Sequence, residues 1–256
     1  MHPHAETLWR GPRWTLAILL AVLGMLGPFS IDTYLPAFSG IASSLNASPV
    51  HMQQTLSAYL FGFAFMNLFH GALADSFGRR PVILWGLMAF TLASLGCALA
   101  QNVTQLIVFR AMQGLSCGAG VVVSRAIVRD IFPPTQAQKV MSQITIFFGL
   151  APAIAPIMGG WLFVSLGWHS IFWLLTAIGL ALWAVNFKML PESLHASQRQ
   201  PFSIPHLMRG YWQLCTDPRF LLLALASGIP FNGMFLYVLS APAFLGELLQ
   251  LQPTQF

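Results

Sequence analysis

Two ionisable side chains, Asp32 and Arg110, lie inside long apolar stretches of the sequence. An ionised group at membrane depth costs roughly 2.5 to 3.5 kcal/mol on insertion scales, so it usually marks an ion or proton pathway. Asp32 lies four residues before Pro36 at the end of the first apolar stretch, and Arg110 lies six residues after Thr104 at the start of the fourth. Helical rise of about 1.5 Å per residue then places the two side chains at similar depth.

Two interpretations of this pair remain open. In the first, Asp32 is a protonatable carboxylate in a central cavity, and Arg110 adjusts its proton affinity or contacts a substrate. In the second, the two residues form a static ion pair that holds two helices together. The first is favoured, because ionisable residues inside membrane helices usually serve ion or proton movement.

Uncharged polar side chains at membrane depth provide candidates for a substrate cavity. They are Tyr34, Tyr59, Asn67 and Gln113. Taken singly, each is more often a helix-contact group than a ligand. The pair Gly27-Pro28 predicts a kink in the first helix, since proline removes a backbone donor and clashes with the preceding turn. Carbonyls freed there could line the same cavity.

The composition identifies the environment of these residues. Of the 256 residues, 56% are hydrophobic and only 7% are charged, against about 25% charged in a soluble domain. Several uncharged stretches exceed the roughly 18 residues that cross the apolar core of a bilayer. The sequence therefore predicts an all-α integral membrane protein.

We expect seven transmembrane helices, near residues 14–36, 52–73, 81–100, 104–128, 139–162, 168–190 and 220–243. Alternate connections between them hold eleven of the twelve Lys and Arg residues, and the other connections hold none. Basic connections stay on the cytoplasmic side. The N-terminus is therefore expected in the cytosol.

The chain then divides into five segments. They are a cytoplasmic N-terminus, a six-helix bundle, a cytoplasmic linker, a seventh helix, and an external loop with the start of an eighth helix, at residues 1–13, 14–190, 191–219, 220–243 and 244–256. Within the linker, apolar residues at 207, 208, 211 and 214 have helical spacing. This favours a short amphipathic helix on the membrane surface, with a solvated linker as the alternative.

A faint internal repeat divides the six-helix bundle. Gly71-x-Leu73-x4-Gly78 recurs 89 residues later as Gly160-x-Leu162-x4-Gly167. Each copy lies between the second and third helix of a triplet, and an odd number of helices per repeat inverts the second copy in the membrane. The pattern indicates the three-plus-three inverted repeat of secondary transporters.

The segment from Gly71 to Pro81 is the most specific motif in the chain. Gly71 is expected to permit close helix approach, and Gly78 permits a left-handed turn. Pro81 suits a first helical position. Asp75 can form a compact ion network with two arginines, Arg79 and Arg80. Topology alone would explain the arginines, but it would not explain the spacing of glycine and aspartate.

This segment resembles motif A of the major facilitator superfamily, G-x-L-x-D-x-x-G-R-[RK]-x. Three other segments resemble motifs of the same superfamily. Leu106-x3-Arg110-x2-Gln113-Gly114 is similar to motif B, Gly149-x-x-Pro152-x3-Pro156-x-x-Gly159-Gly160 to the antiporter motif C, and Ile31-Asp32-x-Tyr34-Leu35-Pro36 to a helix 1 motif of drug:proton antiporters with twelve helices. Together with Arg125-x4-Asp130, the pattern is closest to the bicyclomycin-resistance (Bcr/CflA) family.

The resemblance implies a multidrug efflux transporter of the bacterial inner membrane, which exchanges inward protons for small amphiphilic drugs of the bicyclomycin or chloramphenicol kind. Asp32 and Arg110 would couple protons. Asp75, Arg79 and Arg80 would latch the cytoplasmic face, and the glycines and prolines of motif C would make the fifth helix pliable. The superfamily has two six-helix halves, so we expect this chain to be the N-terminal part, with most of the second half missing. A full-length protein would be a monomer; this part would need a complementing half.

Other functions are disfavoured. A non-transporting remnant or an assembly partner of a missing half is the alternative to transport. No metalloprotease, nucleophile-elbow or paired-acid pattern indicates an enzyme. Scattered basic residues indicate topology and no nucleic acid. The seven histidines and the cysteines Cys97, Cys117 and Cys215 show no metal-ligand or disulfide spacing, so neither a metal nor a cofactor is expected.

Overall fold

The computed structural model describes residues 9, 12–241 and 244. In this part of the chain, all regular structure is helical. The α-helices are α2 (Arg13–Asp32), α3 (Phe38–Ser44), α4 (Pro49–Phe77), α5 (Arg79–Ala98), α6 (Val103–Ile131), α7 (Pro134–Leu166), α8 (His169–Met189), α9 (Ile204–Thr216) and α10 (Pro218–Ala241), with 3₁₀ turns η1 (Leu35–Ala37) and η2 (Ala196–Gln198). Six segments of the described chain are long and apolar enough to cross a membrane.

Local sequence sets where the helices begin. The Ser48 hydroxyl accepts the His51 N–H at 3.3 Å and caps α4, and the Asn102 side chain accepts the Gln105 N–H at 2.9 Å and caps α6. Such caps satisfy donors that a first turn leaves without intrahelical partners. Gly78 separates α4 from α5 with a φ of 105°, a conformation that glycine adopts without steric cost.

The first apolar segment departs from the predicted continuous helix at 14–36. α2 ends at Asp32, and the chain tightens into 3₁₀ geometry before resuming as α3. Pro36 accounts for the break, because it lacks the N–H that would bond the Asp32 carbonyl in an α-helix. Hydrogen bonds to the third residue back, from Tyr34 N to Ile31 O and from Ala37 N to Tyr34 O, replace it. Asp32 therefore stands at a helix end.

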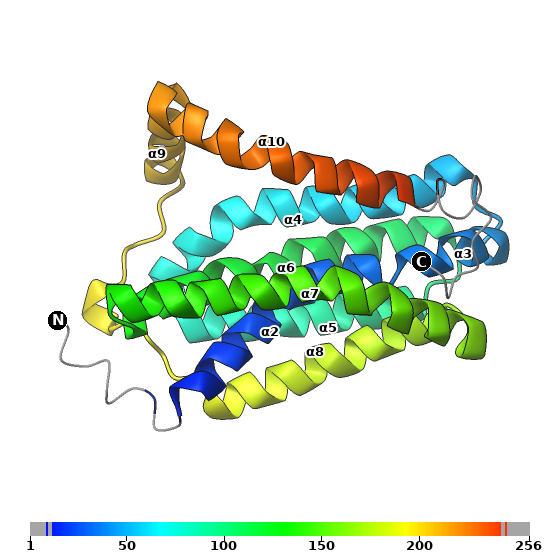
Figure 1. Cartoon of the computed structure of the whole chain (residues 1–256), viewed down its shortest axis with the longest axis horizontal. Coiled ribbons are helices and arrows are strands. Elements are labelled where there is room, and N and C mark those ends of the chain that lie inside the picture. Colours follow the sequence, from blue (N-terminus) through cyan, green and yellow to red (C-terminus); the bar gives the residue numbers. More distant parts are fainter. Residues whose placement is uncertain (1–8, 10–11, 242–243, 245–256) are drawn as a thin grey trace.

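The six long helices run side by side along the long axis of the molecule (Figure 1), and α6 lies against α2, α4 and α5. Between the triplets α2–α4–α5 and α6–α7–α8, the main contacts pair α4 with α6, α5 with α6, α5 with α8 and α2 with α7. Exchanging the triplets converts the α4–α6 pair into the α2–α7 pair and leaves α5–α8 unchanged, whereas α5–α6 has no counterpart of similar extent. The matched pairs are those expected of a three-plus-three inverted repeat.

Close helix approach depends on glycines in the second triplet. A Cβ added to Gly114 would overlap the Tyr59 carbonyl of α4, and one added to Gly159 would overlap the Thr33 carbonyl at the end of α2. Small residues permit such contacts. In a membrane this close packing holds helices together, because lipid chains are as apolar as the helix surfaces and no hydrophobic effect drives the helices to associate. The expectation for Gly71 was wrong. A Cβ there would meet only Val122, at an ordinary 3.8 Å, because Gly71 does not face the helix crossing.

Beyond the bundle, α9 lies across the helix ends and α10 turns back along the long axis (Figure 1). The Ser203 side chain caps α9 through the His206 N–H. Most of α9 is exposed, including Met208, Trp212 and Leu214, and its Tyr211 hydroxyl donates to the Leu68 carbonyl of α4. The linker segment is therefore helical and is attached to the bundle.

Candidate functional site

Arg110 is fully buried in the first half of α6. Its guanidinium carbon lies 4.6 Å from the centre of the Tyr34 ring and 4.3 Å from that of the Tyr59 ring. The quadrupole of an aromatic ring attracts a cation over its face, by about 2 kcal/mol where water is excluded. The two tyrosines therefore stabilise a charge that the apolar interior would otherwise disfavour.

Hydrogen bonds orient the Arg110 guanidinium but leave part of it free. Its Nη1 donates to the Ser30 carbonyl at 3.3 Å and to Gln113 Oε1 at 2.7 Å. Gln113 in turn donates to Ser94 Oγ at 2.7 Å, which connects α6 to α5. Arg110 Nε and Nη2 are buried and have no hydrogen-bond partner among the described residues. The site thus keeps donors available for an acceptor that arrives later.

The two tyrosines are themselves held by hydrogen bonds. The Tyr59 hydroxyl donates to the Gly27 carbonyl at 3.0 Å and lies 2.7 Å from Ser30 Oγ. The Tyr34 hydroxyl lies 2.6 Å from Thr55 Oγ1. Because these bonds join α4 to α2 and to the turn that follows α2, the rings that flank the guanidinium are fixed in place.

Asp32 lies beside this network but does not join it. Its side chain is only 5% exposed, and it follows Ser30, whose carbonyl holds Arg110, by two residues on α2. Within the described chain, no hydrogen bond and no ion pair involves its carboxylate. The static ion pair with Arg110 that the sequence left open is therefore absent. Both groups can still acquire a partner.

The polar residues predicted to line a cavity separate into two groups. Tyr34, Tyr59 and Gln113 are fully buried around Arg110 and satisfy one another or nearby hydroxyls. Asn67 lies elsewhere on α4, where its Oδ1 is next to Gly118 and has no partner in the described part of the structure. Sequence depth alone placed these residues together, but it does not specify the direction in which each side chain leaves its helix.

A second cluster occupies the turn between α4 and α5. Arg79 is 7% exposed; its Nη1 lies 2.5 Å from Asp75 Oδ1 and its Nε lies 3.1 Å from Asp130 Oδ2. Asp130 also accepts the Ser193 hydroxyl at 2.9 Å. The ion network at this turn forms around Arg79 and extends to the end of α6, whereas the expected pairing of Asp75 with Arg80 is absent from the described chain.

Glu192 completes this cluster, and sequence reasoning missed it. One carboxylate oxygen accepts the Arg79 N–H at 2.9 Å and the other accepts the Arg80 N–H at 3.3 Å, so Glu192 caps α5. Arg80 donates back to the Phe187 carbonyl at 2.6 Å. The sequence held one signal, since Glu192 is one of only two acidic residues in the 191–219 connection. The end of α8 is thereby tied to the start of α5.

The residues of the antiporter motif lie on α7, which is 33 residues long and includes Pro152 and Pro156 in its interior. Gly159 forms the close contact with Thr33 described above, and Gly160 is buried. A Cβ added to Gly149 would meet nothing within 4 Å. The two prolines each remove a backbone hydrogen bond from α7, and no neighbouring side chain restrains the backbone at Gly149. α7 can therefore bend more easily where it packs on α2.

No metal cluster accompanies these groups: within the described ranges, no three His, Cys, Asp or Glu side chains come together. Two thiols, Cys97 and Cys117, are buried, and Cys215 is exposed. Six apolar helices with an inverted internal repeat and buried ionisable groups near one another are features of membrane-spanning secondary transporters.

Comparison with known proteins identifies the family. The family model described as Major Facilitator Superfamily matches residues 11–255. The chain belongs to this superfamily, whose members are transporters and not enzymes. The resemblance seen in the motifs is thereby confirmed.

Relatives and a solved structure agree with this assignment. The chain is 38% identical to the bicyclomycin resistance protein homolog of Haemophilus influenzae, over 86% of this chain and 56% of the relative. It is 36% identical to the multidrug resistance protein MdtL of Escherichia coli, over 68% of this chain and 45% of the relative. The inward-facing, unoccupied structure of a bacterial homolog of the human lysosomal transporter Spinster matches the whole chain and 58% of that protein, with a TM-score of 0.73 at 14% identity. The chain thus spans about half the length of these relatives.

Proposed function

We propose that this chain provides the proton-coupling half of a drug:proton antiporter that exports small amphiphilic drugs of the bicyclomycin or chloramphenicol kind. The names of the relatives from Haemophilus influenzae and Escherichia coli support drug export as the activity. The observation that carries the proposal is the state of Asp32, a buried carboxyl without a partner, two residues from the carbonyl that holds Arg110.

Coupling follows from the cost of a buried charge. A carboxylate in an apolar interior is unfavourable unless a cation or hydrogen-bond donors compensate it. Protonated Asp32 is therefore stable in the arrangement described above, where Arg110 interacts with tyrosines instead. Loss of the proton to the cytosol would leave a carboxylate for which Arg110 Nε and Nη2 are available donors. Arg110 would then leave the two tyrosines for Asp32. This movement would change the contacts of Arg110 with α2, α4 and α5 according to the protonation state of Asp32.

Drug binding competes with the proton in this scheme. The polar groups Tyr34, Tyr59, Asn67 and Gln113 would become accessible as the halves rock, and a drug would bind when Asp32 has released its proton. Uptake of a proton from outside would neutralise Asp32 again and favour release of the drug. Alternating access by rocking of one half against the other is the general mechanism for this type of fold.

Two further elements have roles in this cycle. The cluster of Asp75, Arg79 and Arg80, with Glu192, would close the cytoplasmic side, because breaking it exposes several charged groups at once. α7 would bend at Pro152 and Pro156 as the second half moves past it. We place the full-length transporter in the bacterial inner membrane as a monomer, in line with its bacterial relatives. Its N-terminus would be cytosolic, because basic residues concentrate on one set of connections.

The test uses cells that express the complete coding sequence containing this chain, with Asp32→Asn as the variant. We expect drug efflux driven by the proton gradient to be lost, while the amount of protein in the membrane is unchanged. Asp217→Asn is the matched control, since Asp217 is an exposed carboxylate outside the bundle, and it should export as the wild type does. Undiminished efflux by Asp32→Asn would refute the proposal.

A further inference from the structure

The linker helix α9 separates its apolar and polar side chains more sharply than any of the six long helices. Successive residues of an α-helix are turned by about 100° around its axis. The apolar side of α9 therefore carries Ile204, Leu207, Met208, Tyr211, Trp212 and Cys215, and the opposite side carries His206, Arg209 and Gln213. A helix with this pattern lies at a boundary between an apolar and a polar environment.

The bundle covers only one edge of the apolar side. Leu207 is half-buried, and Tyr211 donates to the Leu68 carbonyl of α4. The other large apolar side chains are open, with exposed fractions of 56% for Ile204, 44% for Met208 and 72% for Trp212. Most of the apolar side thus faces away from the described protein.

Two backbone carbonyls of α4 give the level at which α9 is held. The Gln200 N–H donates to the Asp75 carbonyl at 3.1 Å, beside the charged α4–α5 turn, and Tyr211 donates to the Leu68 carbonyl. Leu68 precedes Asp75 by seven residues, which is about 10 Å of helical rise toward the middle of the bundle. Helices of membrane interfaces bury their apolar faces about 5 to 10 Å into the boundary between headgroups and acyl chains. α9 is therefore held at the depth of such a boundary.

The direction of α9 also fits a membrane surface. It lies across the long axis along which the six long helices run (Figure 1). Only Asp217 separates its last residue, Thr216, from the apolar helix α10, which begins at Pro218. So short a connection keeps α9 at the surface where α10 enters the bilayer.

The charge of α9 matches the headgroups of phospholipids. Arg209 is exposed, α9 contains no acidic residue, and no ion pair within the described chain involves Arg209. Guanidinium groups pair well with phosphate. Tyr211 and Trp212 are of the two residue types that are enriched at membrane interfaces.

We propose that α9 binds the phospholipid leaflet on the side of the α4–α5 turn. Ile204, Met208 and Trp212 would lie among the acyl chains, and Arg209 among the headgroup phosphates. The connection between α8 and α10 is then anchored in the membrane at a fixed depth and is not a solvated linker. Binding to the leaflet requires only the membrane fold and does not depend on proton coupling.

A nitroxide label on Cys215 distinguishes lipid, water and protein as the surroundings of the apolar side. Cys215 is exposed, whereas Cys97 and Cys117 are buried, so a thiol reagent added to the folded chain reacts at Cys215. The chain is placed in nanodiscs of phosphatidylcholine and phosphatidylglycerol. Power-saturation electron paramagnetic resonance then measures collisions with oxygen, which concentrates among acyl chains, and with a nickel chelate, which stays in water. Cys215→Ser measures the background labelling.

We expect oxygen collisions to exceed nickel collisions at Cys215, because it lies on the apolar side. The order should be reversed for Gln213→Cys in the Cys215→Ser background, because Gln213 lies on the polar side. Met208→Cys and His206→Cys in the same background repeat the comparison seven residues earlier. All these positions are exposed, so labels there should leave the bundle folded.

A charge placed on each side of α9 tests whether the apolar side holds it in the leaflet. Met208→Asp should raise nickel collisions at Cys215 above oxygen collisions, because a carboxylate resists transfer into acyl chains. Gln213→Asp, which adds the same charge on the polar side, is the matched control and should leave both values unchanged.

Three results would overturn the proposal. High nickel collisions at all the labelled positions would make α9 a solvated linker. Few collisions with either reagent at Cys215 and at Met208→Cys would show that protein covers the apolar side. Wild-type values at Cys215 in Met208→Asp would show that this side does not hold α9 in the leaflet.

Discussion

Replacing Glu192 by alanine tests whether the linker after α8 holds the start of α5. The Glu192 carboxylate accepts the N–H groups of Arg79 and Arg80, at 2.9 and 3.3 Å, and its side chain is 27% exposed. Loss of a helix cap costs about 0.5 to 2 kcal/mol, and loss of a negative charge at a helix N-terminus costs roughly 0.3 to 1 kcal/mol. Together these predict a local destabilisation of about 1 to 3 kcal/mol.

Hydrogen exchange measures this quantity directly. If the turn opens locally, a destabilisation of about 1 to 3 kcal/mol speeds exchange of the Arg79 and Arg80 amides roughly 5- to 150-fold. Mass spectrometry of peptides that cover the α4–α5 turn, from the chain in detergent micelles, reports the rate. Glu192→Gln should give an intermediate value, because it keeps one oxygen acceptor but loses the charge.

Asp75→Asn is the matched control for the same turn. Asp75 is 49% exposed and pairs with Arg79 four residues along the helix, and Arg79 retains Asp130 when that pair is lost. Such pairs contribute at most about 0.5 kcal/mol, so exchange should change by no more than about twofold. Wild-type exchange in Glu192→Ala, or a larger effect from Asp75→Asn, would refute the reasoning.

Other predictions concern packing and the linker helix. Gly114→Ala should lower the free energy of unfolding by about 1 to 3 kcal/mol, because the new Cβ overlaps the Tyr59 carbonyl. Gly149→Ala, which adds a Cβ in open space, should raise it by up to about 1 kcal/mol; equal shifts in detergent unfolding would contradict this. Tyr211→Phe should speed hydrogen exchange in α9 by removing the bond to the Leu68 carbonyl. Burial raises the pKa of Tyr211, so the bond should persist below the ordinary tyrosine pKa and be lost as pH rises through the raised value. Protection of α9 relative to the intrinsic exchange rate that stays constant over this pH range would contradict the prediction.

The membrane fold and the superfamily could be predicted from the sequence, because hydropathy, charge placement and motif spacing are local properties. The Gly78 turn and the pairing of Asp75 with Arg79 follow from neighbouring residues in the same way. Proline at position 36 also contained a local signal. Its missing N–H ends α2 at Asp32, although the sequence alone suggested a continuous helix.

The direction in which side chains leave their helices could not be predicted. Asp32 and Arg110 lie near the same level, but the guanidinium faces Tyr34 and Tyr59 instead of the carboxylate. Asn67 has suitable depth but lies beside Gly118, away from Arg110. The orientation of each side chain depends on its contacts with residues of other helices.

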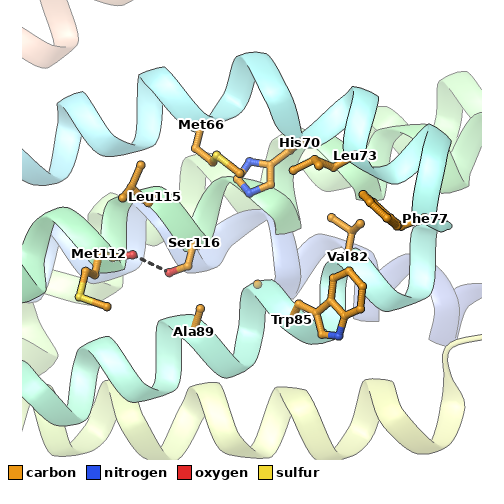
Figure 2. Close-up of a pocket in the computed structure, with 11 residues that line it drawn as sticks. Met66, His70, Leu73, Phe77, Val82, Trp85, Ala89, Met112, Leu115 and Ser116 are labelled. Atoms are coloured by element: carbon orange, nitrogen blue, oxygen red, sulfur yellow. Dashed lines mark hydrogen bonds between the residues drawn. The ribbon is translucent and has the colours of Figure 1, made fainter. Parts of the chain in front are cut away.

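Contacts between distant segments were missed for the same reason. Glu192 caps α5 from 113 residues further along the chain than Arg79. His70 lies among apolar side chains of α4, α5 and α6 (Figure 2), which the histidine spacing in the sequence does not indicate. No local pattern specifies either arrangement, because both arise when separate helices pack.

The central claim is that Asp32 exchanges a proton for drug. The most direct measurement is drug-driven proton movement in proteoliposomes that contain the product of the complete coding sequence, compared with the Asp32→Asn variant. We predict that a drug gradient moves protons in the wild type and not in the variant, because the neutral amide mimics the protonated, drug-releasing state of Asp32 and cannot exchange a proton. Unchanged drug-driven proton movement in Asp32→Asn would contradict the account.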